Sequence, residues 1–346
     1  NADSRAALIG NYHGTSSEYI TVLEGIREEA GDDVRILYSQ GCDLYKDKVE
    51  NLAWDQDRIS EAVITAENSD VVILCVGLDE TLEGEEGDTG NSDASGDKVD
   101  LHLPKVQEEL IEKVTAVGKP TIVVLMAGSA IDLNYAQDNC NGILLAWYPG
   151  ARGGRAIADL LFGKESPSGK LPITFYKDLE GMPEFTDYSM KNRTYRYMEK
   201  EALYPFGYGL SYTTFGLDTI AMWETENQIF AEVQVTNTGN LAGKEVVQIY
   251  FEAPQGLLKK PARQLAAFAK TRLLQPGETQ QIRLSFAKAD MASYDDLGKI
   301  KKSAYILEKG TYKFYIGTSV RDTKESILTM ELAENVITKQ LTCLLY

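Results

Sequence analysis

The fold is decided by residues 71–104, which read VVILCVGLDETLEGEEGDTGNSDASGDKVDLHLP. The segment opens on an apolar run, Val71–Val76, which is typical of a strand buried on both faces. An amphipathic helix pattern begins at Pro104 and continues to Val117. Between strand and helix lies a long loop of Glu, Asp, Gly and Ser, and loops longer than roughly 12–15 residues in a compact domain are usually functional or disordered. In an open α/β sheet such a loop lies where ligands bind, outside the carboxyl ends of the strands.

Strands and helices alternate through the rest of the first half. Apolar runs predict strands at Ala6–Ile9, Val34–Tyr38, Val71–Val76, Thr121–Met126, Ile143–Trp147 and Ile173–Tyr176. Helical patterns separate them at Thr21–Glu29, Arg58–Asn68, Pro104–Val117 and Gly153–Phe162. This alternation predicts an α/β sandwich over residues 1–176, in which helices cover both faces of a mostly parallel six-stranded sheet.

The pattern changes in the second half. Short strands are expected at Ile229–Thr236, Lys244–Phe251, Gln264–Leu274, Thr279–Phe286 and Thr311–Ile316, with turn residues between them. Residues 213–346 are therefore predicted to form an all-β sandwich with a C-terminal tail. Residues 177–212 are rich in tyrosine, proline and glycine, unlike a flexible linker. We expect this segment to connect the two domains and to pack against them.

Composition narrows the function. The 346 residues are 43% hydrophobic and 25% charged, which is typical of a globular protein of about two domains. No apolar run has the roughly 18 residues of a membrane span. The net charge of -17 disfavours nucleic acids and anionic membranes, which bind positive surfaces. A neutral substrate such as a sugar is compatible with this charge.

Cysteine and histidine usage predicts no cofactor and no metal. The cysteines Cys42, Cys75, Cys140 and Cys343 are far apart and form no Cys-x-x-Cys pair. Two histidines, His13 and His102, are too few for a multi-histidine metal centre. The free-thiol pattern favours a reducing compartment such as the cytoplasm. Secretion stays open, because a processed chain would show no signal peptide.

Four segments carry a family resemblance. They are AWYPG with GG and ADLLFG (146–163), PSGKLPITF (167–175), YPFGYGLSY (204–212), and TNTG with GKEVVQIY (236–250). Together and in this order they resemble the C-terminal part of glycoside hydrolase family 3, the β-glucosidase and β-xylosidase family. The resemblance covers nearly the whole chain and implies a fibronectin type III-like fold for the second half. It also implies an exo-acting, retaining enzyme that removes terminal β-D-glucosyl or β-D-xylosyl residues from gluco- or xylo-oligosaccharides.

One part of the family pattern is missing. Members normally carry a (β/α)8 barrel whose aspartate is the nucleophile, and nothing in this sequence resembles it. We therefore expect the chain to be a C-terminal portion that is inactive until a barrel is supplied in cis or in trans.

The resemblance assigns the general acid/base to the acidic loop. The Gly84-Glu85 pair fits the family's Gly-Glu register best, so Glu85 is the first candidate, Glu83 the second and Glu86 the third. Asp97-Lys98 stands where the family often has Asp-Arg. Neighbouring carboxylates raise one another's pKa, which helps one of them to stay protonated as an acid.

Each feature also has a simpler interpretation. An acidic loop of this kind is most often merely solvated, and the whole chain could be a non-catalytic carbohydrate-binding or scaffold module. The β-domain could also serve mainly to drive assembly into a homo-oligomer or to support the other domain. The histidines and tryptophans suit packing as well as sugar contact. Gly150, Gly153 and Gly154 suit either an anion cradle or a tight turn with close packing. Arg193, Tyr195 and Arg196 suit either a glycan cleft or a clamp between domains.

Overall fold

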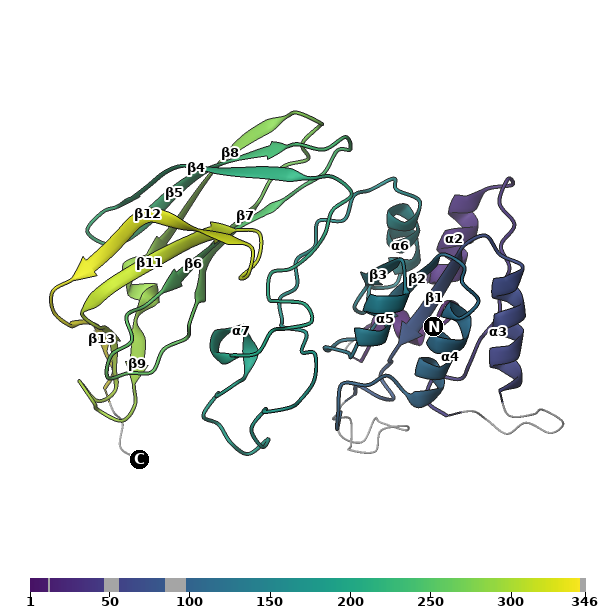
Figure 1. Ribbon diagram of the computed structural model, residues 1–346, viewed down its shortest axis with the longest axis horizontal. Coiled ribbons are helices and arrows are strands. Elements are labelled where there is room, and N and C mark those ends of the chain that lie inside the picture. The colour runs from purple at the N-terminus through teal and green to yellow at the C-terminus, as the bar shows by residue number, and fades with distance from the viewer. Residues whose placement is uncertain (12, 47–55, 85–97, 343–346) are drawn as a thin grey trace. The chain divides into compact units, whose positions relative to one another are not determined.

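The computed structural model describes residues 1–11, 13–46, 56–84 and 98–342, and its course is drawn in Figure 1. Two compact units are present. The first comprises residues 1–165 with 175–180, and the second comprises residues 166–174 with 181–346. The predicted domain boundaries, which divide the chain into residues 1–176, 177–212 and 213–346, stay a prediction.

The first unit has an α/β fold. Its elements are α1 (Ala6–Ile9), α2 (Val22–Ala30), α3 (Asp57–Glu67), β1 (Val72–Gly77), α4 (Lys105–Thr115), β2 (Thr121–Met126), α5 (Asn134–Asn139), β3 (Gly142–Leu145) and α6 (Gly153–Leu161). Within the described residues, the three strands form a parallel sheet in the order β1-β2-β3. Val72 lies opposite Thr121, and Ile122 lies opposite Gly142. The predicted α/β class is confirmed.

Helices cover both faces of this sheet. Successive side chains of a strand point to opposite faces, so an apolar strand makes both faces apolar. On one face, Val124 and Met126 are fully buried against Val22 of α2 and Ile157 of α6. The intervening residues of β2 are fully buried as well, although they point to the opposite face. Helix α4 contacts β1 and buries Leu110, Ile111 and Val114. Figure 1 shows α3 beside α4 and α2 beside α6.

The prediction of six strands was wrong for the described residues. Ala6–Ile9 forms the short helix α1, which ends where the Gly10 N–H donates to the Ala6 carbonyl. A four-residue apolar run cannot be distinguished from a buried helical turn by its pattern. Residues 34–38 form no strand, with Val34 in a bend and 47% exposed, and residues 173–176 contain a single bridge residue instead of a strand.

Two glycines allow α2 and α6 to approach closely. A Cβ at Gly25 would lie 2.2 Å from the Gly154 carbonyl oxygen, and a Cβ at Gly154 would lie 1.9 Å from the Thr21 carbonyl oxygen. Both clashes are with backbone, which cannot rotate away. The tight-packing interpretation of the glycines after β3 is therefore the one that the structure supports.

Replacing Gly25 by alanine should destabilise the first unit. Alanine favours a helix over glycine by about 1 kcal/mol, but forcing a methyl group into a packed site costs about 1–3 kcal/mol or more. Because the clashing atoms are backbone, we expect the cost to exceed the gain and the free energy of unfolding to fall. Urea denaturation of the 346-residue chain measures this, with Gly14→Ala as control because a Cβ at Gly14 meets nothing within 4 Å. A Gly25→Ala protein as stable as its parent would contradict the packing argument.

The second unit is built from antiparallel sheets. Its elements are α7 (Thr194–Tyr197), β4 (Phe215–Glu224), β5 (Gln228–Asn237), β6 (Val246–Glu252), β7 (Gln264–Lys270), β8 (Thr279–Ala287), the 3-10 helix η1 (Lys288–Met291), β9 (Ser293–Asp295), β10 (Ala304–Leu307), β11 (Gly310–Gly317), β12 (Thr323–Leu332) and β13 (Val336–Gln340). The sheets β12-β11-β6-β7 and β4-β5-β8 enclose one core, and β13-β10-β9 forms a third, smaller sheet. The predicted β-sandwich is confirmed, whereas β4, β9, β10, β12 and β13 were not predicted. Along the described ranges, no helix is both long enough and apolar enough to cross a membrane.

Candidate active site

The candidate active site lies at the carboxyl edge of the parallel sheet, where three loops meet. Gly77 ends β1 with a φ of 140°, and a Cβ there would lie 1.8 Å from the Met126 carbonyl oxygen. The buried side chain of Gln107, on α4, holds this point: its amide donates to the Gly77 carbonyl at 2.8 Å and accepts from the Gly77 N–H at 2.8 Å. The chain then turns at Asp79, whose carbonyl accepts the Glu83 N–H at 2.9 Å. The acidic loop thus leaves the sheet along a fixed path.

The Glu83 carboxylate is bound by three donors from the neighbouring loops. Its Oε2 accepts the Gly128 N–H and the Tyr148 hydroxyl, each at 2.6 Å, and its Oε1 accepts the Ser129 hydroxyl. Gly128 and Ser129 follow β2, and Tyr148 follows β3. Glu83 therefore joins the ends of all three strands. A Cβ at Gly128 would press on the Tyr148 ring at 2.9 Å, so glycine is needed for this approach.

Lys98 lies near the C-terminal end of the acidic loop and binds the same segment after β2. Its ammonium group donates to the Ser129 hydroxyl oxygen at 2.9 Å and to the Ala130 carbonyl at 2.7 Å. Ser129 consequently bridges the two ends of the acidic loop, because it accepts from Lys98 while it donates to Glu83. Three residues later, the Leu101 carbonyl accepts the Asp132 N–H at 2.7 Å. Both stems of the loop are thus attached to the segment after β2.

Burial shapes the electrostatics of this network. Desolvation lowers the pKa of Lys98, and the nearby Glu83 carboxylate opposes that shift. Burial also raises the pKa of Tyr148, with a further contribution from its hydrogen bond to Glu83. Tyr148 is therefore a neutral hydroxyl donor over the whole physiological pH range. Charge-assisted hydrogen bonds of this kind are stronger than neutral ones, so the network is suited to holding the loop stems in place.

A strained residue directs Tyr148 toward Glu83. Trp147, directly after β3, has a φ of 55°, a left-handed conformation that is uncommon for a bulky residue. Such a conformation costs about 1–2 kcal/mol. Strain of this size is often retained where it positions a functional group. Here it turns the chain so that the next side chain reaches Glu83.

The predicted site residues are only partly described. Glu83 and Lys98 lie in the network, whereas Glu85, Glu86 and Asp97 lie outside the described residues. Sequence reasoning missed Gly128, Ser129 and Tyr148. Their common signal is position, because each comes within three residues of the end of a predicted strand, at the edge where ligands bind.

The histidines are not part of this network. His13 lies 3.4 Å from a Glu80 carboxylate oxygen, and His102 Nδ1 lies 2.9 Å from the Glu108 carboxylate. The bond to Glu108 raises the pKa of His102. The described parts of the chain hold no cluster of His, Cys, Asp and Glu side chains that could bind a metal ion.

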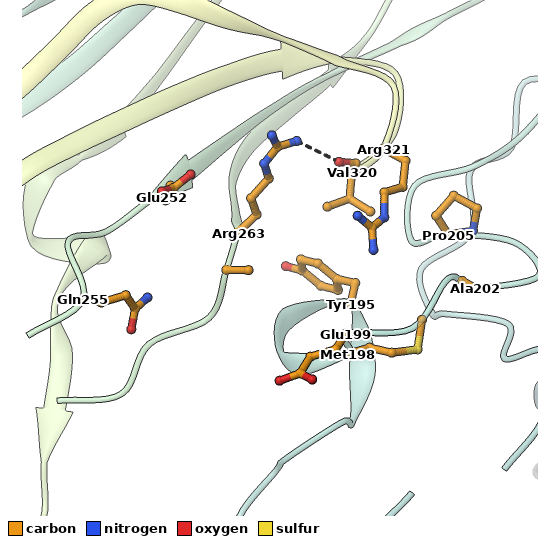
Figure 2. Close-up of a pocket in the computed structure, with 11 residues that line it drawn as sticks. Tyr195, Met198, Glu199, Ala202, Pro205, Glu252, Gln255, Arg263, Val320 and Arg321 are labelled. Carbon is orange, nitrogen blue, oxygen red and sulfur yellow. Dashed lines mark hydrogen bonds between the residues drawn. The ribbon is translucent and has the colours of Figure 1, made fainter. Parts of the chain in front are cut away.

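Four more of the residues considered for sugar contact, Arg193, Tyr195, Arg196 and Trp223, lie in the second unit. Arg193 donates to the carbonyls of Pro183 and Glu184, at 3.3 and 2.7 Å. Arg196 lies over the Tyr195 ring, and Tyr195 lines a pocket that Figure 2 shows. Trp223 stacks on Phe230 at 5.4 Å between ring centroids.

The order of folds, a parallel α/β unit followed by an antiparallel β-sandwich, is that of a class of glycoside hydrolases. Residues 1–212 match the family described as Glycosyl hydrolase family 3 C-terminal domain, and residues 245–320 match the Fibronectin type III-like domain. The chain therefore belongs to glycoside hydrolase family 3.

Relatives of known name agree with this membership. The chain is 43% identical over 279 residues to Beta-glucosidase A of Butyrivibrio fibrisolvens, covering 71% of this chain and 34% of the relative. It is 35% identical over 337 residues to a Beta-xylosidase of Formosa agariphila, covering 94% of this chain and 43% of the relative. A solved β-glucosidase structure from Paenibacillus barengoltzii superposes with a TM-score of 0.77 at 28% identity, covering 98% of this chain and 40% of that one. The chain thus spans between a third and a half of these relatives.

Proposed function

We propose that this chain supplies the general acid/base to an exo-acting, retaining β-glycosidase, with Glu85 as the catalytic carboxyl group. The substrate would be a β-linked gluco- or xylo-oligosaccharide, cleaved from its non-reducing end. Membership of the family supports the reaction class, and the names of the relatives support both glucose and xylose as the sugar removed.

The observation that carries the proposal is the attachment of both loop stems. Glu83 and Lys98 bind the same residue, Ser129, so the acidic segment between them begins and ends at the carboxyl edge of the sheet. This edge is where open α/β sheets bind ligands. The anchoring of Glu83 and Lys98 at this edge supports a catalytic role for a carboxyl group in the sequence between them.

The contacts of Glu83 favour Glu85 over it as the proton donor. A general acid needs an oxygen within hydrogen-bond reach of the glycosidic oxygen. Both oxygens of Glu83 already accept hydrogen bonds from the protein, so Glu83 suits an anchoring role. Glu85 keeps the first place from the Gly-Glu register, and Glu86 is the next candidate in the loop.

The second carboxylate would come from a (β/α)8 barrel, in cis or in trans. In retaining glycosidases the nucleophile and the acid/base lie about 5–5.5 Å apart across the scissile bond. The nucleophile attacks the anomeric carbon while Glu85 protonates the departing oxygen. Glu85 then takes a proton from the water that releases the sugar from the enzyme.

The 346-residue chain alone should hydrolyse neither aryl β-glucosides nor aryl β-xylosides, because one carboxylate cannot complete the double displacement. Adding the barrel, joined or as a separate chain, should restore turnover. Proton NMR of the first product should then show the β-anomer, the outcome of retention. Turnover by the isolated chain, or an α-anomer as first product, would overturn the proposal.

A further inference from the structure

The second unit contains a pocket that the proposed reaction does not use. It encloses about 720 Å³, within the range of roughly 300–1,000 Å³ that is typical of small-molecule sites. One wall comes from α7 and the residues after it, a second from the end of β6 and the start of β7, and a third from the turn between β11 and β12. All of its lining residues belong to this one unit.

The floor of the pocket is held in place by packing. Tyr195 stacks on Phe206 at 4.2 Å between centroids and meets the buried Tyr250 edge-on at 6.3 Å. Its hydroxyl accepts the Leu265 N–H at 3.1 Å, which ties α7 to β7. The Ala262 N–H also donates to the Arg196 carbonyl at 3.0 Å. The pocket is therefore preformed, which lowers the entropy cost of binding.

Two charged side chains of the pocket, Arg263 and Glu252, are held in place but keep atoms that can form further hydrogen bonds. Arg263 lies flat on the Tyr315 ring, 3.7 Å from the centroid, and its Nη1 donates to the Val320 carbonyl at 3.2 Å and to the Thr323 hydroxyl at 2.7 Å. Among the described residues, its Nε and Nη2 have no hydrogen-bond partner. Glu252 accepts the Tyr315 hydroxyl at 2.8 Å through Oε2, and its Oε1 is likewise unpaired within the described part of the chain.

Two further charged side chains, Arg321 and Glu199, are exposed at the rim of the pocket. Figure 2 shows the guanidinium groups of Arg263 and Arg321 on one side of the hollow and Glu199 with Met198 on the other. The two arginines and the two glutamates cancel in formal charge, so neither an anion nor a cation is favoured. The remaining lining is partly apolar, with Met198 and Val320 beside the Tyr195 ring.

We propose that this pocket binds a neutral sugar of one or two pyranose rings. Carboxylate and guanidinium groups form strong, paired hydrogen bonds with hydroxyl groups, and the apolar surface suits the C–H faces of a sugar ring. A charged ligand would bring two of the four lining charges into repulsion. The second unit would therefore hold a glycan independently of the acidic loop in the first unit.

Isothermal titration of the 346-residue chain with cellobiose and with xylobiose tests the proposal. Both disaccharides should bind, and Arg321→Ala and Glu252→Gln should each weaken binding about tenfold, the effect of losing a hydrogen bond to a charged group. Glutamine at 252 keeps a carbonyl oxygen for the Tyr315 hydroxyl, and Arg321 is exposed, so both variants should fold. Circular dichroism checks this.

The matched control is Arg272→Ala, an exposed arginine of the same unit that pairs with Glu278 and does not line the pocket. It should leave the affinity unchanged. This test reads binding by the second unit, whereas the catalytic proposal is read by turnover in the barrel-containing protein, so the failure of one is distinguishable from the failure of the other. Absence of binding by both disaccharides, equal weakening by Arg272→Ala, or tighter binding of glucuronic acid or glucosamine than of glucose would each overturn the proposal.

Discussion

Replacing Glu85 by glutamine in the barrel-containing protein is expected to slow hydrolysis of aryl β-glycosides with weakly acidic phenols by about 10²–10⁴-fold, the usual contribution of a general acid. Glutamine keeps the size of the side chain but has no proton to give to the departing oxygen. The loss should fall on kcat/KM, because protonation assists bond cleavage in the first chemical step.

The leaving group gives this prediction its specificity. A strongly acidic phenol departs without protonation, so kcat/KM for a dinitrophenyl glycoside should be nearly unchanged in the Glu85→Gln protein. Release of the sugar should then limit turnover, since no base activates water. Added azide needs no base, so it should raise kcat and give a β-glycosyl azide, which chromatography can identify.

Glu86→Gln and Glu83→Gln are the comparisons that assign the role. Only the variant of the true acid/base should show both leaving-group dependence and azide rescue. If Glu86→Gln alone shows them, the register is shifted by one residue. Wild-type rates in all three variants would mean that the acidic loop is merely solvated.

Local patterns predicted most of the first unit. The strand expected at Thr121–Met126 is β2 itself, and the four predicted helices lie within two residues of α2, α3, α4 and α6. These elements combine a clear period with recognisable ends, such as the capping box in which Thr21 and Glu24 exchange hydrogen bonds at the start of α2. The wrong strand predictions fell on runs of four or five residues, where helix, strand and extended loop share one apolar pattern. Helix α5 was not predicted.

The sequence predicted where the candidate site lies, but not which residues bind Glu83 there. A long acidic loop after a buried strand marked the carboxyl edge of the sheet, and this required only local sequence. The partners of Glu83 lie 45, 46 and 65 residues away along the chain. No local period encodes such contacts. They arise only when the three strands align in parallel and bring their ends together.

Replacing Glu83 by alanine should destabilise the first unit by about 2–4 kcal/mol. The change removes the acceptor for the Gly128 N–H and for the Ser129 and Tyr148 hydroxyls, and donors left unsatisfied in a partly buried site carry most of that cost. Lys98 also loses its nearby countercharge. Urea denaturation of the 346-residue chain, followed by circular dichroism, measures the fall in the free energy of unfolding.

Glu28→Ala is the matched control, because Glu28 bonds Arg155 at 2.7 Å on the exposed surface of the same unit, where solvent screens ion pairs and they contribute little to stability. In the barrel-containing protein, Glu83→Ala should also lower kcat, because the stem of the acidic loop is released. Its pattern differs from that of Glu85→Gln, since azide cannot restore a misplaced acid/base. A Glu83→Ala protein of unchanged stability would show that Glu83 does not anchor the loop. Full azide rescue of that variant would instead make Glu83 the acid/base itself.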